Sequence, residues 1–320
     1  MISISISSIS SKVANTTRLT SNTFRSSFRS FSSIISSSTS SSTSSSALSP
    51  INVTLFAYKI CPFCCKTKSI LKFAKVPFKA IEVNPLTKNE LKVMEKSLVS
   101  KEDAGKKVEV YRKVPIALFH NTTPDSSPVR INGSTEIVSL LPSLSLLNGA
   151  RLAYKSQSKN DSEFDDEHAM KWLSWCDDSL SVRIYPVLTQ SFASSLRSFS
   201  YLDTIPSMSK MEVIVAKYVG SFFMVLGREK LKKKYNITDA NESLKNEILK
   251  WETDGLSGKK FNGGEFAPNI ADVGVYGVLK GLEITSGGSE GVNWHAEIVL
   301  GNKVVKDWYV RMGNVVGELE

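Results

Sequence analysis

The stretch that decides the fold is INVTLFAYKICPFCCKTKSIL, residues 51–71. The β-branched and aromatic run from Val53 to Phe56 predicts a short buried strand. After it, apolar residues recur at helical spacing, so the sequence predicts a helix that begins just after Cys61. Pro62 then occupies the first helical position, where its missing N–H leaves no hydrogen bond unmade.

This junction places a thiol at the start of a helix. At that position unpaired backbone N–H groups and the positive end of the helix dipole favour thiolate over thiol, and Lys59 adds a nearby cation. We therefore expect Cys61 to be the nucleophile. Cys64 lies one turn further in and is placed to resolve a mixed disulfide.

A C-x-x-C pair also occurs in zinc sites and in structural disulfides. A zinc site needs further ligands, yet there is no second C-x-x-C, and His120, His168 and His295 are scattered singly. A chain of 320 residues with four cysteines is no disulfide scaffold either. The sequence favours a catalytic pair and predicts no metal site.

The composition, with 41% hydrophobic and 22% charged residues, is that of a soluble globular protein. The net charge of +9 has a local origin, because the first acidic residue is Glu82. Nucleic-acid binding is therefore not expected. The first 49 residues are rich in serine and arginine without any acid, which predicts a disordered transit segment, mitochondrial rather than plastid. A low-complexity tail without targeting function is the alternative.

From Pro50 onward strand and helix signals alternate. Residues 77–85 predict a second strand, parallel to the first across a βαβ unit. The further elements expected are a helix and charged loop over 86–110, strands that begin at Ile116 and Val129, and a helix from Gly133 to about Leu147. Pro115 cannot donate to a ladder, so it belongs at a strand start or in a special turn.

Residues 149–166 form a polar linker. The sequence after it has helical patterns, and two of the helices that it predicts span 187–199 and 211–234. The apolar run 213–226 is interrupted by Lys217 and is too short to cross a membrane. The basic residues at 228–234 complete a helix dipole or, alternatively, contact anionic lipid or a ligand's acidic groups. Asn269 and Asp272 form a capping box that fixes a buried helix.

An ordered set of motifs resembles the membrane-associated prostaglandin E synthase type 2 family. The likeness extends from about Val53 to the last helix, and C-P-F-C alone would be shared with glutaredoxins. The motifs are Tyr58-Lys59-Ile60-Cys61-Pro62-Phe63-Cys64, Glu82-Val83-Asn84-Pro85, Tyr111-Arg112-Lys113-Val114-Pro115-Ile116, Lys217-Tyr218-Val219-Gly220, Pro268-Asn269-Ile270-Ala271-Asp272 and Val275-Tyr276-Gly277-Val278-Leu279.

The resemblance implies a fold and an activity. The fold is an α/β thioredoxin-like domain (50–148), a linker (149–166) and an all-α glutathione-transferase-like domain (167–320), after the disordered segment 1–49. The activity is the thiol-dependent isomerisation of prostaglandin H2 to prostaglandin E2. The family also implies a homodimer in the mitochondrion, soluble or peripherally attached to a membrane. The apolar anchor often present near the family's N-terminus is missing, so we expect a soluble matrix form.

Carried onto this sequence, the resemblance makes Cys61 the essential thiol and Tyr58 its neighbour in the pocket. An apolar groove between the domains would hold the fatty chain, with Phe222, Phe223 and Met224 as candidate lining residues and plain core as the alternative. The family also binds haem together with glutathione, which changes the outcome to endoperoxide breakdown. Haem propionates would then be sought near the basic residues at 228–234.

The same resemblance implies a glutathione site. In thioredoxin-like folds a Val-Pro such as Val114–Pro115 is a cis bond beside the thiol, whereas an ordinary X–Pro bond is trans. Val114 would offer its backbone to glutathione. Ser134 and Thr135 would lie near the γ-glutamyl end, although helix capping alone also explains them.

The sequence departs from the family pattern at two further points, and two other functions remain as alternatives. The segment 86–110 is longer than the family leads one to expect and reshapes one rim of the site. Gly133 stands where an acidic residue normally precedes the serine, so we expect weakened glutathione binding. The alternatives to the isomerase are a glutaredoxin-like thiol–disulfide oxidoreductase or glutathione transferase with a non-prostanoid substrate, and a noncatalytic protein that binds haem or glutathione.

Overall fold

The computed structural model describes residues 51–98, 111–120, 127–140, 166–205, 208–286 and 293–319. The expected transit segment, residues 1–49, lies outside this part, so its targeting role stays a prediction. The end of the charged segment 86–110 and nearly all of the linker 149–166 also lie outside it.

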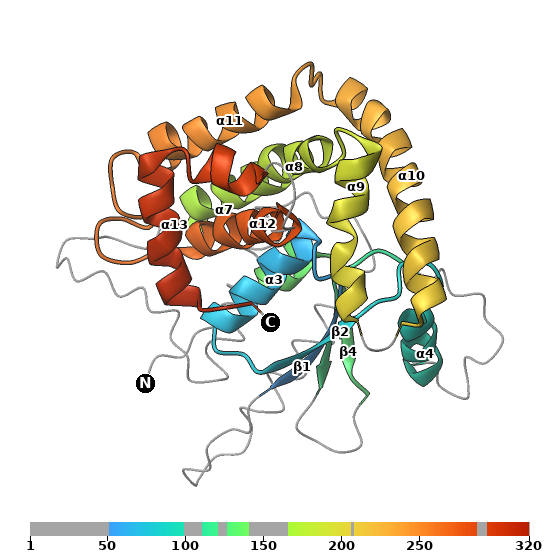
Figure 1. Cartoon of the computed structure of the whole chain (residues 1–320). Coiled ribbons are helices and arrows are strands. Elements are labelled where there is room, and N and C mark those ends of the chain that lie inside the picture. The colour runs from blue at the N-terminus through green and yellow to red at the C-terminus, as the bar shows by residue number, and fades with distance from the viewer. Residues whose placement is uncertain are drawn as a thin grey trace, which may run out of the picture.

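A four-stranded mixed sheet forms the first half of the molecule (Figure 1). Its order is β2-β1-β3-β4, with β2 parallel to β1 and the other neighbours antiparallel. All four strands and the parallel first pair were predicted from the sequence. Their bounds are Asn52–Ala57 for β1, Phe78–Glu82 for β2, Ile116–His120 for β3 and Val129–Asn132 for β4.

Helices cover both faces of this sheet because side chains alternate along each strand. Leu55 of β1 packs in the large core with helix α3 (Pro62–Phe73) and helix α5 (Ser134–Ser139). Phe56, its neighbour, packs in a smaller cluster with helix α4 (Asn89–Leu98). The described part of α5 ends before the predicted Leu147, and the residues after Leu140 lie outside the described part.

The second half is helical, as expected, and follows the thioredoxin-like domain. Its α-helices are α7 (Asp166–Trp175), α8 (Ser181–Leu188), α9 (Phe192–Ser198), α10 (Lys210–Lys234), α11 (Ala240–Lys250), α12 (Ile270–Ser286) and α13 (Lys303–Val316). Short η segments lie between them, among them η1 (Cys176–Leu180) and η2 (Ser200–Thr204). No helix in the described ranges has the length and apolar character that crossing a membrane requires.

The single helix predicted over 187–199 was wrong, because the chain turns between α8 and α9. Ser191 starts α9 with a reciprocal cap: its Oγ accepts the Ser194 N–H at 3.0 Å, and Ser194 Oγ accepts the Ser191 N–H at 2.9 Å. Such a cap satisfies backbone donors that a continuous helix would have paired internally. The serine pair therefore favours a new helix start over continuation.

The capping box predicted at the start of α12 is confirmed. Asn269 Oδ1 accepts the Asp272 N–H at 3.1 Å, while Asp272 Oδ2 accepts the Asn269 N–H at 2.8 Å. Asp272 is fully buried and also accepts Trp308 Nε1–H from α13 at 2.9 Å. Burial raises the pKa of Asp272 to about 6, against the opposing effect of these hydrogen bonds. One carboxylate thus joins α12, its preceding loop and α13.

Helix α12 lies directly against α3, the helix that follows the cysteines (Figure 1). Two glycines make this possible. A Cβ on Gly277 would lie 2.6 Å from the Cα of Lys66, and a Cβ on Gly281 would lie 3.1 Å from the Cα of Pro62. The helical domain therefore touches the backbone of α3 at the turn that carries the thiols.

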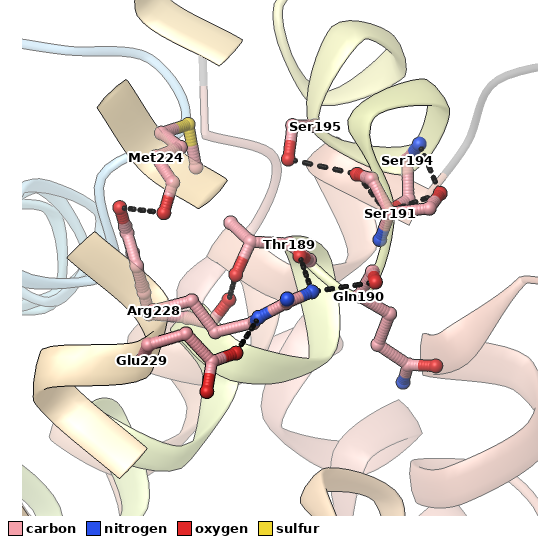
Figure 2. A network of polar contacts seen from close by, with 9 residues as sticks. Thr189, Gln190, Ser191, Ser194, Ser195, Met224, Arg228 and Glu229 are labelled. Atoms are coloured by element: carbon pink, nitrogen blue, oxygen red, sulfur yellow. Dashed lines mark hydrogen bonds and ion pairs between the residues drawn. The ribbon is translucent and has the colours of Figure 1, made fainter. Parts of the chain in front are cut away.

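Helix α10 is held by a polar network on its C-terminal half (Figure 2). The Arg228 guanidinium donates to the carbonyl oxygens of Thr189 and Gln190 at 2.7 and 2.5 Å. The Tyr185 hydroxyl donates to the Met224 carbonyl oxygen at 2.8 Å. These bonds tie α10 to the corner between α8 and α9, where unpaired carbonyls at a helix end need donors.

We predict that Gly277→Ala lowers the free energy of unfolding by about 2 kcal/mol, because the added methyl group overpacks the contact between α12 and α3. Alanine is otherwise the better helix former, so the sign of the change separates crowding from helix propensity. Urea denaturation followed by circular dichroism measures it.

Gly313→Ala in α13 is the matched control, since the nearest atom to its Cβ would be the Tyr276 hydroxyl at 3.6 Å. There we expect a gain of up to about 1 kcal/mol from helix propensity. Equal changes at both positions would show that the helix contact tolerates a methyl group.

Candidate active site

Cys61 is the residue immediately before α3. It has extended backbone angles (φ −73°, ψ 121°), and its carbonyl oxygen accepts the Cys65 N–H at 2.9 Å. Pro62 follows at the first helical position, as predicted. Cys61 is partly exposed, whereas Cys64 and Cys65 are buried, with 0% and 1% of their surface exposed. One of three neighbouring thiols is therefore accessible.

The Cys61 sulfur is surrounded by donors. The Cys64 thiol donates a hydrogen bond to it, and the backbone N–H groups of Cys64 and Phe63 at the helix start point their positive ends toward it. The Cys64 bond is the largest contribution and lowers the pKa of Cys61 in spite of the opposing effect of burial. The arrangement stabilises a thiolate at Cys61.

The same hydrogen bond acts in the opposite sense on the pKa of Cys64, and burial adds to it. Burial and the bond that its thiol donates to Cys61 raise the pKa of Cys64 well above its usual range. Burial also raises the pKa of Cys65 to about 12, and its thiol donates to the Lys59 carbonyl oxygen at 3.2 Å. Cys64 and Cys65 therefore stay protonated while Cys61 ionises. The thiolate, which is the nucleophilic form, is thus confined to Cys61.

Lys59 holds the turn before Cys61 through its backbone, and its charge also acts on the neighbouring Glu82 carboxylate. Its N–H donates to Glu82 Oε1 at 3.0 Å, so the carboxylate at the end of β2 holds the turn before Cys61. The Glu82 charge raises the pKa of Cys61, which partly offsets the donors. Tyr201 of η2 also hydrogen-bonds Glu82, and this contact brings the helical domain to the thiol turn.

Tyr58, the expected neighbour of the thiol, lies partly buried against the cluster beneath α4. Its pKa is raised to about 12, first by burial and then by the nearby cysteines 64 and 61. Its carbonyl oxygen accepts the Cys61 N–H at 3.2 Å. The hydroxyl is therefore a neutral hydrogen-bond donor at ordinary pH.

The residues expected to bind glutathione lie on adjoining segments. The Val114–Pro115 peptide bond is cis, as predicted. The Pro115 carbonyl oxygen accepts the Gly133 N–H at 2.9 Å, which joins this turn to the start of α5. Ser134 follows Gly133 and has 7% of its surface exposed. Val114, just before β3, and Ser134, just after β4, thus lie at the same end of these two paired strands.

Two other side chains at this helix start make contacts that the sequence did not predict. The Thr135 hydroxyl donates to Asp177 Oδ2 at 3.2 Å, so it is engaged with the helical domain. The Glu136 carboxylate folds back over Gly133, so closely that a Cβ on this glycine would overlap it. Gly133 has a φ of +91°, a conformation that other residues rarely adopt. A carboxylate thus lies beside position 133, although the residue at that position is glycine.

A buried ion pair, not foreseen from the sequence, joins the domains beside this helix. The Lys66 ammonium, on a residue with 1% of its surface exposed, lies 2.5 and 2.6 Å from the Asp177 carboxylate oxygens. Lys66 belongs to α3 and Asp177 to η1.

In the described ranges, no group of three or more His, Cys, Asp or Glu side chains is arranged to hold a metal ion.

Comparisons with known proteins agree with this architecture. The glutaredoxin family model matches residues 53–101. Prostaglandin E synthase 2 of Mus musculus is 30% identical over 301 residues, which cover 84% of this chain and 71% of the relative. Prostaglandin E synthase 2 of Danio rerio is 28% identical over 295 residues, covering 82% of this chain and 70% of the relative.

One solved structure is similar in fold over most of this chain. A glutathione transferase from Phanerochaete chrysosporium superposes with a TM-score of 0.51 at 13% identity, covering 85% of this chain and 99% of that one. At this level of identity the likeness concerns the fold alone. It supports a thioredoxin-like domain followed by a glutathione-transferase-like helical domain.

We predict that the alkylation rate of Cys61 by iodoacetamide follows a pKa below the ordinary thiol value of about 8.5. Cys64→Ala removes the strongest donor to the sulfur, so the thiolate loses stabilisation and the pKa of Cys61 rises. At pH values below the pKa of Cys61, the thiolate fraction, and the rate with it, falls about tenfold when that pKa rises by one. Mass spectrometry of the peptide that contains Cys61 measures the rate.

Cys65→Ala is the control, because that thiol donates to the Lys59 carbonyl and not to Cys61. We expect its profile to stay close to that of the unaltered protein. If Cys64→Ala gives the same profile as Cys65→Ala, the hydrogen bond between Cys64 and Cys61 does not set the reactivity.

Proposed function

This chain belongs to the prostaglandin E synthase 2 family, and from that premise we propose that it is a thiol-dependent isomerase that converts prostaglandin H2 to prostaglandin E2. The observation that carries the proposal is the distribution of protons among the cysteines. Cys61 is accessible and has a lowered pKa, while its two neighbours are buried and protonated. An isomerase that opens a peroxide needs one such nucleophile.

The reaction proceeds in two steps. The Cys61 thiolate attacks one peroxide oxygen, which forms an S–O bond, breaks the O–O bond and leaves the other oxygen as an alkoxide that takes up a proton. The carbon that bears the S–O oxygen then loses its proton. Its electron pair forms the ketone, the S–O bond breaks and the thiolate returns, so there is no net oxidation or reduction.

The neighbouring groups have matching roles. The Cys64 thiol stabilises the thiolate before attack and after release, because it donates to the same sulfur in both states. The Tyr58 hydroxyl, with its pKa raised to about 12, stays protonated and is a donor for the developing alkoxide. These assignments require Cys61 for chemistry and Cys64 for tuning.

We propose glutathione, or another thiol of similar shape, as the second ligand. Its peptide groups would pair with the backbone of Val114 beside the cis bond, and its γ-glutamyl end would meet Ser134. The Glu136 carboxylate over Gly133 would be the partner of the ammonium group. Thr135 would contribute less, since its hydroxyl is engaged with Asp177.

A second function is favoured by a specific observation. The glutaredoxin match and the hydrogen-bonded Cys61–Cys64 pair suit a thiol–disulfide oxidoreductase or glutathione transferase with a non-prostanoid substrate. Haem finds less support, because Arg228 at the basic end of α10 already donates to Thr189 and Gln190 (Figure 2). A propionate there would have to displace those carbonyls.

We predict that Cys61→Ser reduces prostaglandin E2 formation from prostaglandin H2 to the rate without protein. Cys64→Ser retains the isomerase reaction, because the serine hydroxyl can still donate a hydrogen bond to the Cys61 sulfur. Product analysis by mass spectrometry, with and without glutathione and against a protein-free control, measures both.

The same Cys64→Ser variant separates the alternatives. A dithiol oxidoreductase needs both cysteines, so this variant would lose disulfide reduction at every pH. Identical products from the unaltered protein and Cys61→Ser would remove the support for an isomerase.

We also predict that Ser134→Ala and Glu136→Gln each weaken glutathione binding by about tenfold, the loss of one hydrogen bond to a charged group. Thr135→Ala is the control and changes affinity by less than about twofold, within the span of a few tenths of a kcal/mol. Isothermal titration calorimetry measures the affinities. Unchanged binding in Glu136→Gln would show that this carboxylate does not replace the absent acid at position 133.

A further inference from the structure

The second step of the isomerisation requires a base. In that step the carbon that bears the S–O oxygen loses a proton, and a well-positioned base contributes about 10²–10⁴-fold to the rate of such a transfer. The Cys64 thiol and the Tyr58 hydroxyl do not fit this role, because their raised pKa values keep both groups protonated. A carboxylate beside the sulfur would fit it.

Glu82 lies where the two parallel strands end beside the thiol. It is the last residue of β2 and pairs in register with Ala57, the last residue of β1. The Val83 N–H donates to the Ala57 carbonyl oxygen at 3.0 Å, which fixes this end of the pair. Residues 58–60 then connect β1 to Cys61. Glu82 and Cys61 therefore share the carboxyl ends of the parallel strands, where ligands of α/β sheets bind.

The Glu82 carboxylate is oriented from both domains. The Lys59 N–H donates to its Oε1 at 3.0 Å, so the turn that carries the thiol holds one oxygen. The Tyr201 hydroxyl of η2 also hydrogen-bonds the carboxylate, and burial raises the pKa of Tyr201, so it remains a donor. Tyr201 has 9% of its surface exposed and packs in the apolar cluster of the helical domain that Ile60 contacts. Two neutral donors thus hold the carboxylate without cancelling its charge.

The surroundings make Glu82 a stronger base than a carboxylate in water. Burial raises the pKa of Glu82 in spite of the opposing effect of its hydrogen bonds. The residue is nevertheless partly exposed, so it is not sealed inside the protein. Its charge acts on the Cys61 sulfur and on Tyr58. Nucleophile, hydroxyl donor and carboxylate are therefore gathered at one place.

A role in holding the turn does not explain why this residue is charged. The negative charge of Glu82 raises the pKa of Cys61, so it opposes the thiolate on which the first step depends. The amide oxygen of a glutamine would accept the Lys59 N–H equally well without this opposing effect. A carboxylate that takes part in the chemistry accounts for both observations.

We propose, on the premise of the isomerase function above, that Glu82 is the base of the reaction and that Tyr201 positions it. In the first step Tyr58 gives its proton to the alkoxide. In the second step Glu82 takes the proton from carbon, the electron pair of the C–H bond forms the ketone, and the S–O bond breaks to return the Cys61 thiolate. The protonated Glu82 then gives its proton to the Tyr58 phenolate, so every group ends as it began.

Glu82→Gln separates basicity from structure, because the amide oxygen still accepts the Lys59 N–H. We expect kcat for prostaglandin E2 formation to fall at least about 100-fold. Alkylation of Cys61 by iodoacetamide at pH 7 is expected to stay the same or become faster, since a charge that raises the pKa of Cys61 is gone. A general loss of structure would not move the two rates apart in this way.

Glu90→Gln is the matched control. The Glu90 carboxylate also accepts a backbone N–H, that of Asn84 at 2.9 Å, and its charge also acts on Tyr58. Because we assign it no proton transfer, both rates are expected to stay within about twofold of those of the unaltered protein.

Tyr201→Phe tests the positioning role with the carboxylate in place. We expect kcat to fall about tenfold with KM unchanged, because one hydrogen bond that orients the base in the transition state is lost. Tyr185→Phe is the control, since that hydroxyl donates to the Met224 carbonyl oxygen within the helical domain. It is expected to leave kcat unchanged.

An isotope effect identifies the step that Glu82→Gln slows. The substrate is prostaglandin H2 with deuterium on the two ring carbons that bear the peroxide oxygens. If proton removal from carbon has become slow, the deuterated substrate reacts several times more slowly with this variant. Slow turnover without an isotope effect would overturn the inference.

Two further results would also overturn it: a Glu82→Gln variant that forms prostaglandin E2 within about twofold of the unaltered rate, or one in which turnover and Cys61 alkylation fall together. Failure of the proposed function has a different signature, because the unaltered protein and Cys61→Ser would then give the same products. A reaction that requires Cys61 and is indifferent to Glu82→Gln refutes the base alone.

Discussion

The close approach of α12 to α3 is the contact on which the surroundings of the thiol depend. Gly277 and Gly281 allow one helix backbone to lie on the other, and the second of them meets Pro62, the residue after Cys61. A helix start normally faces solvent, where water satisfies its N–H groups. Here a second domain covers the flank of that helix, so the N–H groups and the dipole act on the sulfur in a medium of lower dielectric.

That covered position explains why three neighbouring cysteines differ so strongly. Burial penalises every thiolate, which raises the pKa of both Cys64 and Cys65. At Cys61 the same low dielectric strengthens the hydrogen bond from Cys64 and the attraction of the helix start, and these outweigh the penalty. One cause therefore produces both the reactive thiol and the two inert ones.

Local signals made much of this predictable from the sequence. The run from Val53 to Phe56, Pro62 after the first cysteine, and the capping box at Asn269 each depend on residues within one turn or strand. The contacts that shape the site, by contrast, join residues that are far apart in the sequence. Glu82 meets Tyr201 and Lys66 meets Asp177 across more than a hundred residues, and a charged residue such as Lys66 usually indicates solvent exposure. The bond from the Lys59 N–H to Glu82 is likewise a contact between residues that are distant in the sequence.

Helix α10 illustrates a second limit, which concerns which face of an apolar helix is buried. Its apolar positions have helical spacing, yet the inner face consists of Val213 and the small residues Ala216, Gly220 and Ser221, and the outer face of larger ones. On the inner face a Cβ on Gly220 would lie 2.7 Å from the Phe199 ring, and Val213 and Ala216 pack in one apolar cluster with that ring. Large apolar side chains are then left outside, where only another apolar surface removes them from water. Hydrophobic periodicity alone assigns the large residues to the core, whereas the structure places them on the surface.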